Sequence, residues 1–136
     1  METIVIDADI NNMDCVTELI EEQLEQVQCP EDTIMDIETA AEEIFANVAH
    51  YAYKTGKGTV TMTIEVLAQE KNVIVTFTDN GVPFNPLAKP DPDTAETLHN
   101  DQIGGLGIYI VKKTMDKVEY KYENKKNILV LEKKFE

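Results

Sequence analysis

Three glycines fall within four residues in the run Gly104-Gly105-Leu106-Gly107, directly before an apolar stretch that predicts a short helix. Glycines leave backbone N–H groups unobstructed, and a helix N-terminus adds the positive end of its dipole, so this arrangement suits phosphate binding. The run lacks the GK[ST] of a P-loop and does not follow a strand, so neither the Walker nor the Rossmann mechanism applies. A helix that simply starts with glycines is the alternative.

A carboxylate and a carboxamide lie four positions apart, at Glu43 and Asn47. Residues four apart on a helix lie one above the other on the same face, and His50 and Lys54 continue this polar stripe. The solvated face of an amphipathic helix gives the same pattern, so the spacing alone does not assign a function to this pair.

Asp79-Asn80-Gly81 ends an apolar run that is rich in β-forming residues. A carboxylate is thereby placed at the end of a strand, and the glycine lets a ligand approach the backbone closely. An ordinary Asx turn has the same sequence. The following segment, 80–103, contains four prolines and supports neither a strand nor a long helix, which is typical of a functional or disordered loop.

These residues need a small α+β domain to position them. Alternation around Ile4 and Ile6 predicts a first strand, and apolar residues at helical spacing predict helices over 13–27 and from Pro30 to about Tyr53. The remaining elements are a hairpin of 59–68 with 72–78, a helix over 108–115, and a closing antiparallel pair of 117–122 with 128–135. No repeat or linker divides the chain, so one domain over 1–136 is expected.

Composition narrows the classes of partner. The formal net charge of -14 repels phosphate backbones and anionic membrane surfaces, so nucleic acid and membranes are poor partners. No run approaches the roughly 20 apolar residues of a membrane span, and acidic Glu2 and Asp7 stand where a secretory signal needs basic residues. Cys15 and Cys29 lack metal-binding spacing, which favours reduced thiols and a cytoplasmic location.

Taken in order, the helical Glu43/Asn47 pair, the strand-end Asp79-x-Gly81, the long loop and the glycine-rich helix start resemble the N, G1 and G2 boxes of the GHKL ATPases. The runs 43–53, 79–87 and 104–111 are similar to those of the stand-alone anti-sigma-factor serine kinases. The resemblance covers nearly the whole chain. It implies an N box at about 38–54, G1 at 79–87, a lid at about 85–103 and G2 at 104–111.

The resemblance also implies a fold and a set of roles. The fold is the Bergerat type, an α+β two-layer sandwich whose mostly antiparallel mixed sheet is covered on one face by about three helices. Glu43 matches the general base toward an attacking hydroxyl, and Asn47 matches the ligand of the Mg²⁺ that ATP phosphates hold. Asp79 matches the aspartate that accepts the adenine amino group, and Gly81 matches the glycine that gives the base room. The phosphate cradle would be formed by Gly104, Gly105, Leu106, Gly107 and Ile108.

The resemblance implies an ATP-dependent serine/threonine kinase that acts as an anti-sigma-type factor. Such a protein binds a sigma-like partner, phosphorylates a small STAS-type antagonist and forms a homodimer, for which the exposed first strand offers a route. A nucleotide-dependent binding module without phosphoryl transfer is the alternative. A sensor histidine kinase is disfavoured, unless its phosphoacceptor domain is on another chain, because the sequence starts directly with a strand. A plain scaffold predicts no thermal shift with ATP and Mg²⁺.

Overall fold

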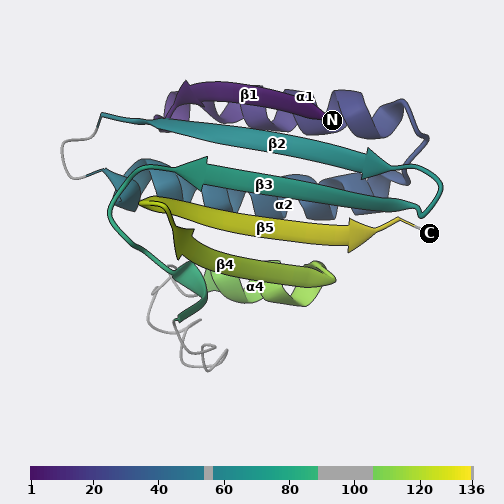
Figure 1. Cartoon of the computed structure of the whole chain (residues 1–136). Coiled ribbons are helices and arrows are strands. Elements are labelled where there is room, and N and C mark those ends of the chain that lie inside the picture. The colour runs from purple at the N-terminus through teal and green to yellow at the C-terminus, as the bar shows by residue number, and fades with distance from the viewer. Residues whose placement is uncertain (54–56, 89–105, 136) are drawn as a thin grey trace.

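The computed structural model describes residues 1–53, 57–88 and 106–135, and it arranges them as a sheet with helices on one of its faces (Figure 1). The sheet has five strands in the order β1-β2-β3-β5-β4. Their bounds are Glu2–Asp7, Thr59–Leu67 and Asn72–Asp79 for β1 to β3, then Lys117–Glu123 and Lys126–Lys134 for β4 and β5. The two-layer α+β fold that the sequence predicts is confirmed, and every strand pair in the described residues is antiparallel.

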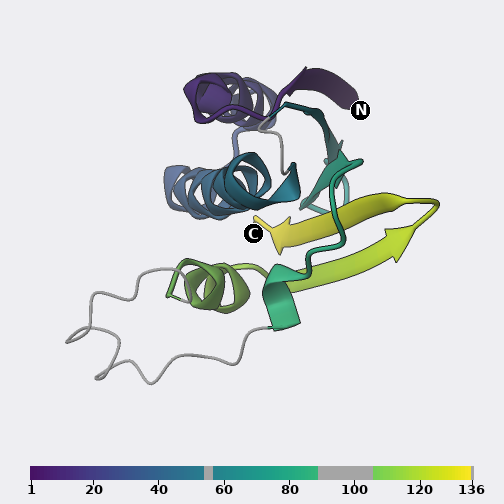
Figure 2. The same ribbon diagram turned by 90° about the vertical axis from the view of Figure 1, so that its left-hand side faces the viewer.

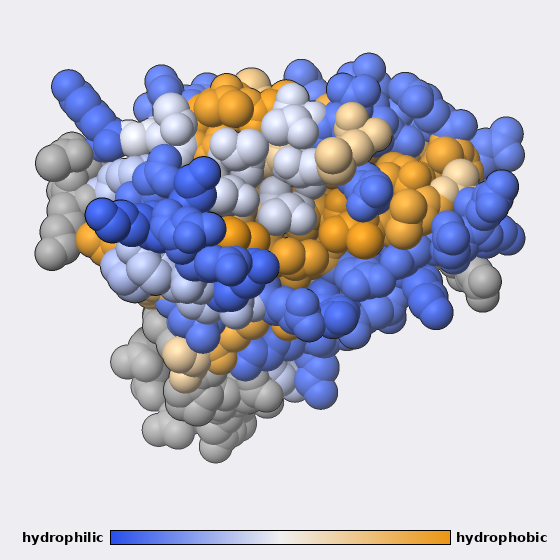
Figure 3. All heavy atoms as spheres, in the orientation of Figure 1, coloured by the Kyte–Doolittle hydropathy of each residue, from blue (hydrophilic) through white to orange (hydrophobic). Residues whose placement is uncertain are grey.

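Alternation along the strands directs one face of the sheet to the helices. In β2 the side chains of Val60, Met62 and Ile64 are buried, whereas Thr61 and Thr63 between them are partly exposed. Successive side chains of a strand point to opposite faces, so the same period-2 pattern that predicts the strand also defines its core face. The opposite face shows pale and apolar side chains over β2, β3 and β5 (Figure 3).

The α-helices of the described residues lie on the core face of the sheet (Figure 2). They are α1, Met13–Glu25, α2, Glu31–Asn47, and α4, Leu106–Thr114, and α2 contacts both of the others. Short helical turns also occur at Ile10–Asn12 (η1) and Pro86–Ala88 (η3). None of the helices in the described part of the chain is long and apolar enough to cross a membrane.

The helix expected from Pro30 to about Tyr53 is α-helical only as far as Asn47 and continues as a π-helix, η2, over Val48–Ala52. A π-helical turn widens the backbone spacing, and such turns are frequent at functional sites. Here the change falls directly after Asn47, one of the residues that the sequence singles out. The core beneath the sheet is built on fully buried side chains such as Ile20, Leu24, Phe45, Phe77 and Leu131.

Candidate functional site

Asp79 lies at the end of β3, one of the inner strands of the sheet, and is only 5% exposed. Its carboxylate oxygen Oδ1 accepts two hydrogen bonds, from the Gly81 backbone N–H at 2.8 Å and from the Asn127 side-chain Nδ2 at 2.9 Å. No described residue donates to Oδ2. The carboxylate is therefore held in one orientation through Oδ1, while Oδ2 keeps its capacity to accept a hydrogen bond from a ligand.

Asn127 is the polar residue of this site that the sequence analysis missed. It pairs with Asp79 in the β3–β5 register, and besides Asp79 its Nδ2 donates to the Val82 carbonyl at 2.8 Å. Its Oδ1 accepts from the Phe84 backbone N–H at 3.1 Å and from the Tyr120 hydroxyl. Asn127 thus connects the ends of two strands to the loop after β3. No local motif marks it, because only the strand pairing brings it to Asp79.

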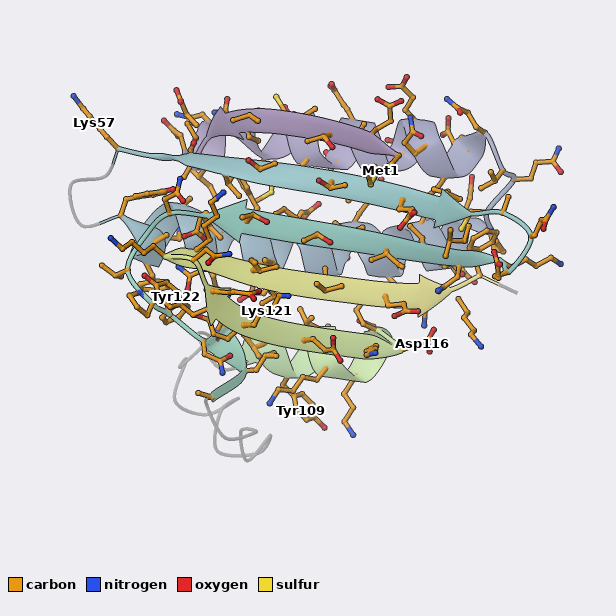
Figure 4. All side chains as sticks on the ribbon, in the orientation of Figure 1. Met1, Lys57, Tyr109, Asp116, Lys121 and Tyr122 are labelled. Atoms are coloured by element: carbon orange, nitrogen blue, oxygen red, sulfur yellow. The ribbon has the colours of Figure 1, made fainter. Side chains whose placement is uncertain are left out.

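Tyr120 donates to Asn127, and its protonation state is set by its surroundings. Burial raises the pKa of its phenol above the ordinary value, and the charge of Asp79 and the neighbouring Tyr122 act in the same direction. The hydrogen bond that involves the Phe84 backbone lowers this pKa in part. The phenol is consequently protonated at neutral pH and remains a donor. Tyr122 comes from β4 at this same end of the sheet (Figure 4).

Gly81 is buried against the end of η2. A Cβ added at Gly81 would overlap the backbone carbonyl of Ala52, and the next residue, Val82, donates its N–H to that same carbonyl at 2.8 Å. The loop after β3 is therefore packed directly on the π-helical turn. This packing explains the need for glycine, and the role of giving an adenine base room stays a prediction.

Asn47 and Asp79 line one small cavity together with Asn127, Phe84 and Tyr120. The cavity measures about 30 Å³, which is room for a water molecule or two. A ligand as large as a purine would therefore have to move lining side chains apart. Phe84, which stacks on the half-exposed Tyr51 with ring centroids 5.4 Å apart, is one of these side chains.

The Asn47 carboxamide fits a ligand-binding role. Its Nδ2 is buried and has no hydrogen-bond partner among the described residues. A buried polar atom without a partner costs about 1–3 kcal/mol, so a group that supplies the missing partner would be stabilising here. The two ends of a carboxamide are assigned from their partners, so an oxygen donor to Mg²⁺ is equally compatible with this position.

Glu43 lies against the first turn of α4. A Cβ added at Gly107 would overlap the Glu43 carboxyl group, so the glycine is what allows this carboxylate to lie beside the backbone of α4. The sequence places Glu43 in the N box and Gly107 in G2, and the fold brings the two side by side. A helix N-terminus offers unpaired N–H groups and a positive dipole end, which suits an anion.

The other residues of the expected phosphate cradle are only partly described. Gly104, Gly105 and the lid from residue 89 to 103 lie outside the described residues. Leu106 is the first residue of α4, two positions before the expected start at Ile108. The Ile108 side chain is 3% exposed and belongs to the hydrophobic core, so only its backbone is available to a ligand.

Within the described ranges, no group of three or more His, Cys, Asp or Glu side chains could hold a metal ion. A Mg²⁺ ion at Asn47 would thus need other oxygen ligands, which triphosphate oxygens and water supply in nucleotide sites. The donor set fits a metal that arrives with its nucleotide.

Comparison with known proteins identifies the family of this chain. Residues 6–133 match the family model described as a histidine kinase-like ATPase domain. The chain is 29% identical over 96 residues to the serine-protein kinase RsbW of Listeria monocytogenes, an alignment that covers 68% of this chain and 60% of that protein. The RsbW of Halalkalibacterium halodurans is 32% identical over 97 residues, covering 68% of this chain and 58% of the relative. The chain thus spans less than two thirds of the length of these relatives.

Solved structures share the fold. The RsbU and RsbW domains of Rv1364c from Mycobacterium tuberculosis superpose with a TM-score of 0.64 at 18% identity, over 98% of this chain and 32% of that one. The SiaB–SiaC complex from Pseudomonas aeruginosa gives a TM-score of 0.55 at 14% identity, over 96% of this chain and 88% of the matched chain. The catalytic domain of the histidine kinase ThkA gives 0.52 at 16% identity, over 99% of this chain and 98% of that one.

Proposed function

Because the chain belongs to the histidine kinase-like ATPase domain family, we propose that it is an ATP-dependent protein serine/threonine kinase that controls a regulatory partner by binding it. The observation that carries the proposal is that Glu43, a candidate base, lies beside the Gly107 end of α4, while Asn47 shares a cavity with Asp79. One helix, α2, therefore contributes residues to both the phosphate end and the adenine end of the proposed nucleotide site.

In the proposed reaction the chain's own residues bind and orient the nucleotide and deprotonate the acceptor hydroxyl. Oδ2 of Asp79 accepts a hydrogen bond from the adenine amino group, and the first turn of α4 with Gly107 faces the phosphates. Glu43 takes the proton of a serine or threonine hydroxyl, the hydroxyl oxygen bonds to the γ-phosphorus, and the bond to the ADP oxygen breaks. Mg²⁺, when bound at Asn47, neutralises charge on the phosphate oxygens.

We propose a small antagonist protein of the STAS type as the substrate and a sigma-like factor as the sequestered partner. Two relatives named serine-protein kinase RsbW support the kinase assignment, and the fold shared with a chain of the SiaB–SiaC complex supports a small-protein partner. The proposal places the chain in the cytoplasm, as a regulator of transcription. It also includes a homodimer through β1, an edge strand on which Val5 is 63% exposed.

The test is a transfer assay with Mg·ATP and the candidate antagonist, read out as phosphoserine or phosphothreonine by mass spectrometry. Glu43→Gln should abolish transfer and leave the ATP-induced thermal shift intact, because the carboxamide keeps the shape but cannot accept the proton. Glu42→Gln is the matched control, since Glu42 is the neighbouring exposed glutamate on the same helix, and it should transfer normally.

Each alternative has its own outcome in this assay. An ATP-induced shift without transfer by the unaltered chain would identify a nucleotide-dependent binding module. Loss of both shift and transfer in Glu43→Gln would make Glu43 structural, and the absence of any shift with ATP and Mg²⁺ would refute the nucleotide site.

A further inference from the structure

The net charge of the chain is confined to its first part. Residues 1–53 contain 14 of the 26 acidic residues and no lysine or arginine, whereas residues 54–136 hold 12 acidic and 12 basic residues. The whole formal charge of -14 therefore belongs to residues 1–53, which form β1, η1, α1, α2, η2 and their connections. The helices α1 and α2 lie side by side on the core face of the sheet (Figure 2). Such an uneven field attracts cationic partners to one side of a molecule.

A groove with an apolar floor lies within this acidic layer, between the end of α1 and the start of α2. Three apolar residues, Cys29, Ile34 and Met35, line the groove and are here called its floor; Cys29 and Ile34 are buried, and Met35 is 63% exposed. Gln28 is in the left-handed region with φ 56°, and it turns the chain from α1 into α2 at one end of the groove. The rim carries carboxylates from both helices, at Glu21, Glu25, Glu31 and Glu38.

Glu38 is a rim carboxylate that is not fully paired among the described residues. Its Oε1 is buried and has no hydrogen-bond partner among the described residues. Desolvation raises the pKa of its carboxyl, and the neighbouring charges of Glu21, Glu42 and Glu25 raise it further. Carboxylates on two helices thus repel one another across the groove, and a cation placed between them would relieve this repulsion.

We propose that this α1/α2 groove docks a basic amphipathic segment of a protein partner, with an apolar side chain on the Cys29–Ile34–Met35 floor and Lys or Arg side chains against the rim. Charge complementarity favours this occupant over nucleic acid, which the field repels, and over the equally acidic α1 and α2 of a second copy of this chain. Glu38 and Asn47 are nine residues apart on α2, about 13 Å along the axis. The docking surface is thus separate from the proposed nucleotide site and does not depend on kinase activity.

The test uses a synthetic amphipathic peptide in which leucines recur at helical spacing among lysines, with a twin peptide that has serine in place of leucine. Binding is measured by fluorescence anisotropy against the full chain. Glu21→Lys with Glu25→Lys should weaken binding about tenfold or more, because like charges then face the peptide. Glu18→Lys with Glu22→Lys is the matched control: it makes the same charge change at exposed positions of α1 outside the groove, and should weaken binding about twofold or less.

The floor is tested separately from the charge. Met35→Ser leaves the charge unchanged and should weaken binding of the leucine peptide. The serine-containing twin peptide should bind poorly to every variant. Equal weakening of peptide binding by both double variants, or no effect of Met35→Ser, would show that the peptide is attracted by the acidic charge in general and not by the groove. Either result would overturn the proposal. Self-association of the chain that the Glu21→Lys/Glu25→Lys variant abolishes would identify a second copy as the occupant and also overturn it. The ATP-induced thermal shift should persist in all variants, so that a failure here is distinct from a failure of the nucleotide site.

Discussion

At the scale of single residues, the proposed adenine end of the site depends on how Asn127 orients Asp79. Asn127 uses both ends of its carboxamide, donating to Asp79 and Val82 and accepting from Phe84 and Tyr120. Buried polar networks that are fully paired fix one geometry, whereas removing one member leaves the others unsatisfied. The orientation of the Asp79 carboxylate is thus a property of the network.

We expect Asn127→Asp to destabilise the protein by about 3 kcal/mol at pH 7 and to weaken ATP binding, because it places two carboxylates in hydrogen-bond contact and removes the donor to Val82. Contact between like charges disfavours the ionised form of the introduced carboxyl, so the lost stability should return in part as the pH falls and this carboxyl binds a proton. Urea unfolding at pH 7 and pH 5 measures this. Asn124→Asp, the same change in the exposed β4–β5 turn, is the control and should have little effect at either pH.

Glu38 gives a prediction with the opposite sign. Since its pKa is raised in the folded protein, the folded state favours the protonated form, and ionisation at neutral pH costs stability. Glu38→Gln should therefore stabilise the protein at pH 7 by about 0.5 kcal/mol, a value kept small by solvent screening. The gain should vanish below the ordinary carboxyl pKa of 4.5. Denaturant titrations at both pH values test this, with the exposed Glu22→Gln as control, and a gain that is independent of pH would contradict it.

The order of the motifs, through the resemblance to the GHKL ATPases, singled out Glu43, Asn47, Asp79 and Gly81 as a set, and the fold places Asn47 in the same cavity as Asp79. Asn127 and Tyr120 could not be found in this way. Asp79 and Asn127 are 48 positions apart, and their contact depends on the β3–β5 register, which sequence periodicity does not specify.

At the scale of elements, two glycines allow close packing in different ways, Gly81 at the end of η2 and Gly107 beside α2. Gly81 lies against the backbone of Ala52, which cannot move away cheaply, whereas Gly107 lies against the end of the Glu43 side chain. The same added methyl group should consequently have different effects at the two positions.

We expect Gly81→Ala to destabilise the protein by about 2–4 kcal/mol, because the new Cβ must displace the end of η2 or the loop after β3. A lower midpoint of thermal unfolding, with loss of the ATP-induced shift, is the expected result. Unchanged stability would show that the loop can move away from Ala52.

Gly107→Ala should instead leave stability equal or higher, since alanine favours a helix over glycine by about 1 kcal/mol and the Glu43 carboxyl can rotate away. Phosphoryl transfer should fall because the proposed base is displaced. Transfer assays alongside thermal unfolding separate the two effects, and normal transfer would show that Glu43 works from another position.

The elements themselves were largely predictable from alternation and helical spacing. Two differences lie at the proposed site: α2 changes to a π-helix after Asn47, and α4 begins at Leu106, which makes Gly107 helical. In both places tertiary packing overrides local preference, since Val82 bonds to Ala52 and Glu43 occupies the space beside Gly107.

At the scale of the whole molecule, the uneven charge should make stability depend on salt. Raising NaCl from about 50 mM to about 500 mM screens the repulsion between carboxylates on β1, α1 and α2, and should raise the unfolding midpoint. Hydrogen exchange should show that amides of α1 gain more protection than amides of β3 and β5, whose part of the chain is balanced in charge. A uniform gain across all elements would mean that the repulsion is not local.

The place of β5 in the sheet has a consequence for synthesis on the ribosome. β5 inserts between β3 and β4, and its Asn127 is the group that holds Asp79, yet residues 126–134 leave the ribosome after every other described strand and helix. A nascent chain that lacks these residues has α2 with Glu43 and Asn47, but it lacks the Asn127 side chain that orients Asp79 at the proposed adenine end. Competence to bind a nucleotide should then appear in a single late step, when this long-range strand pairing closes.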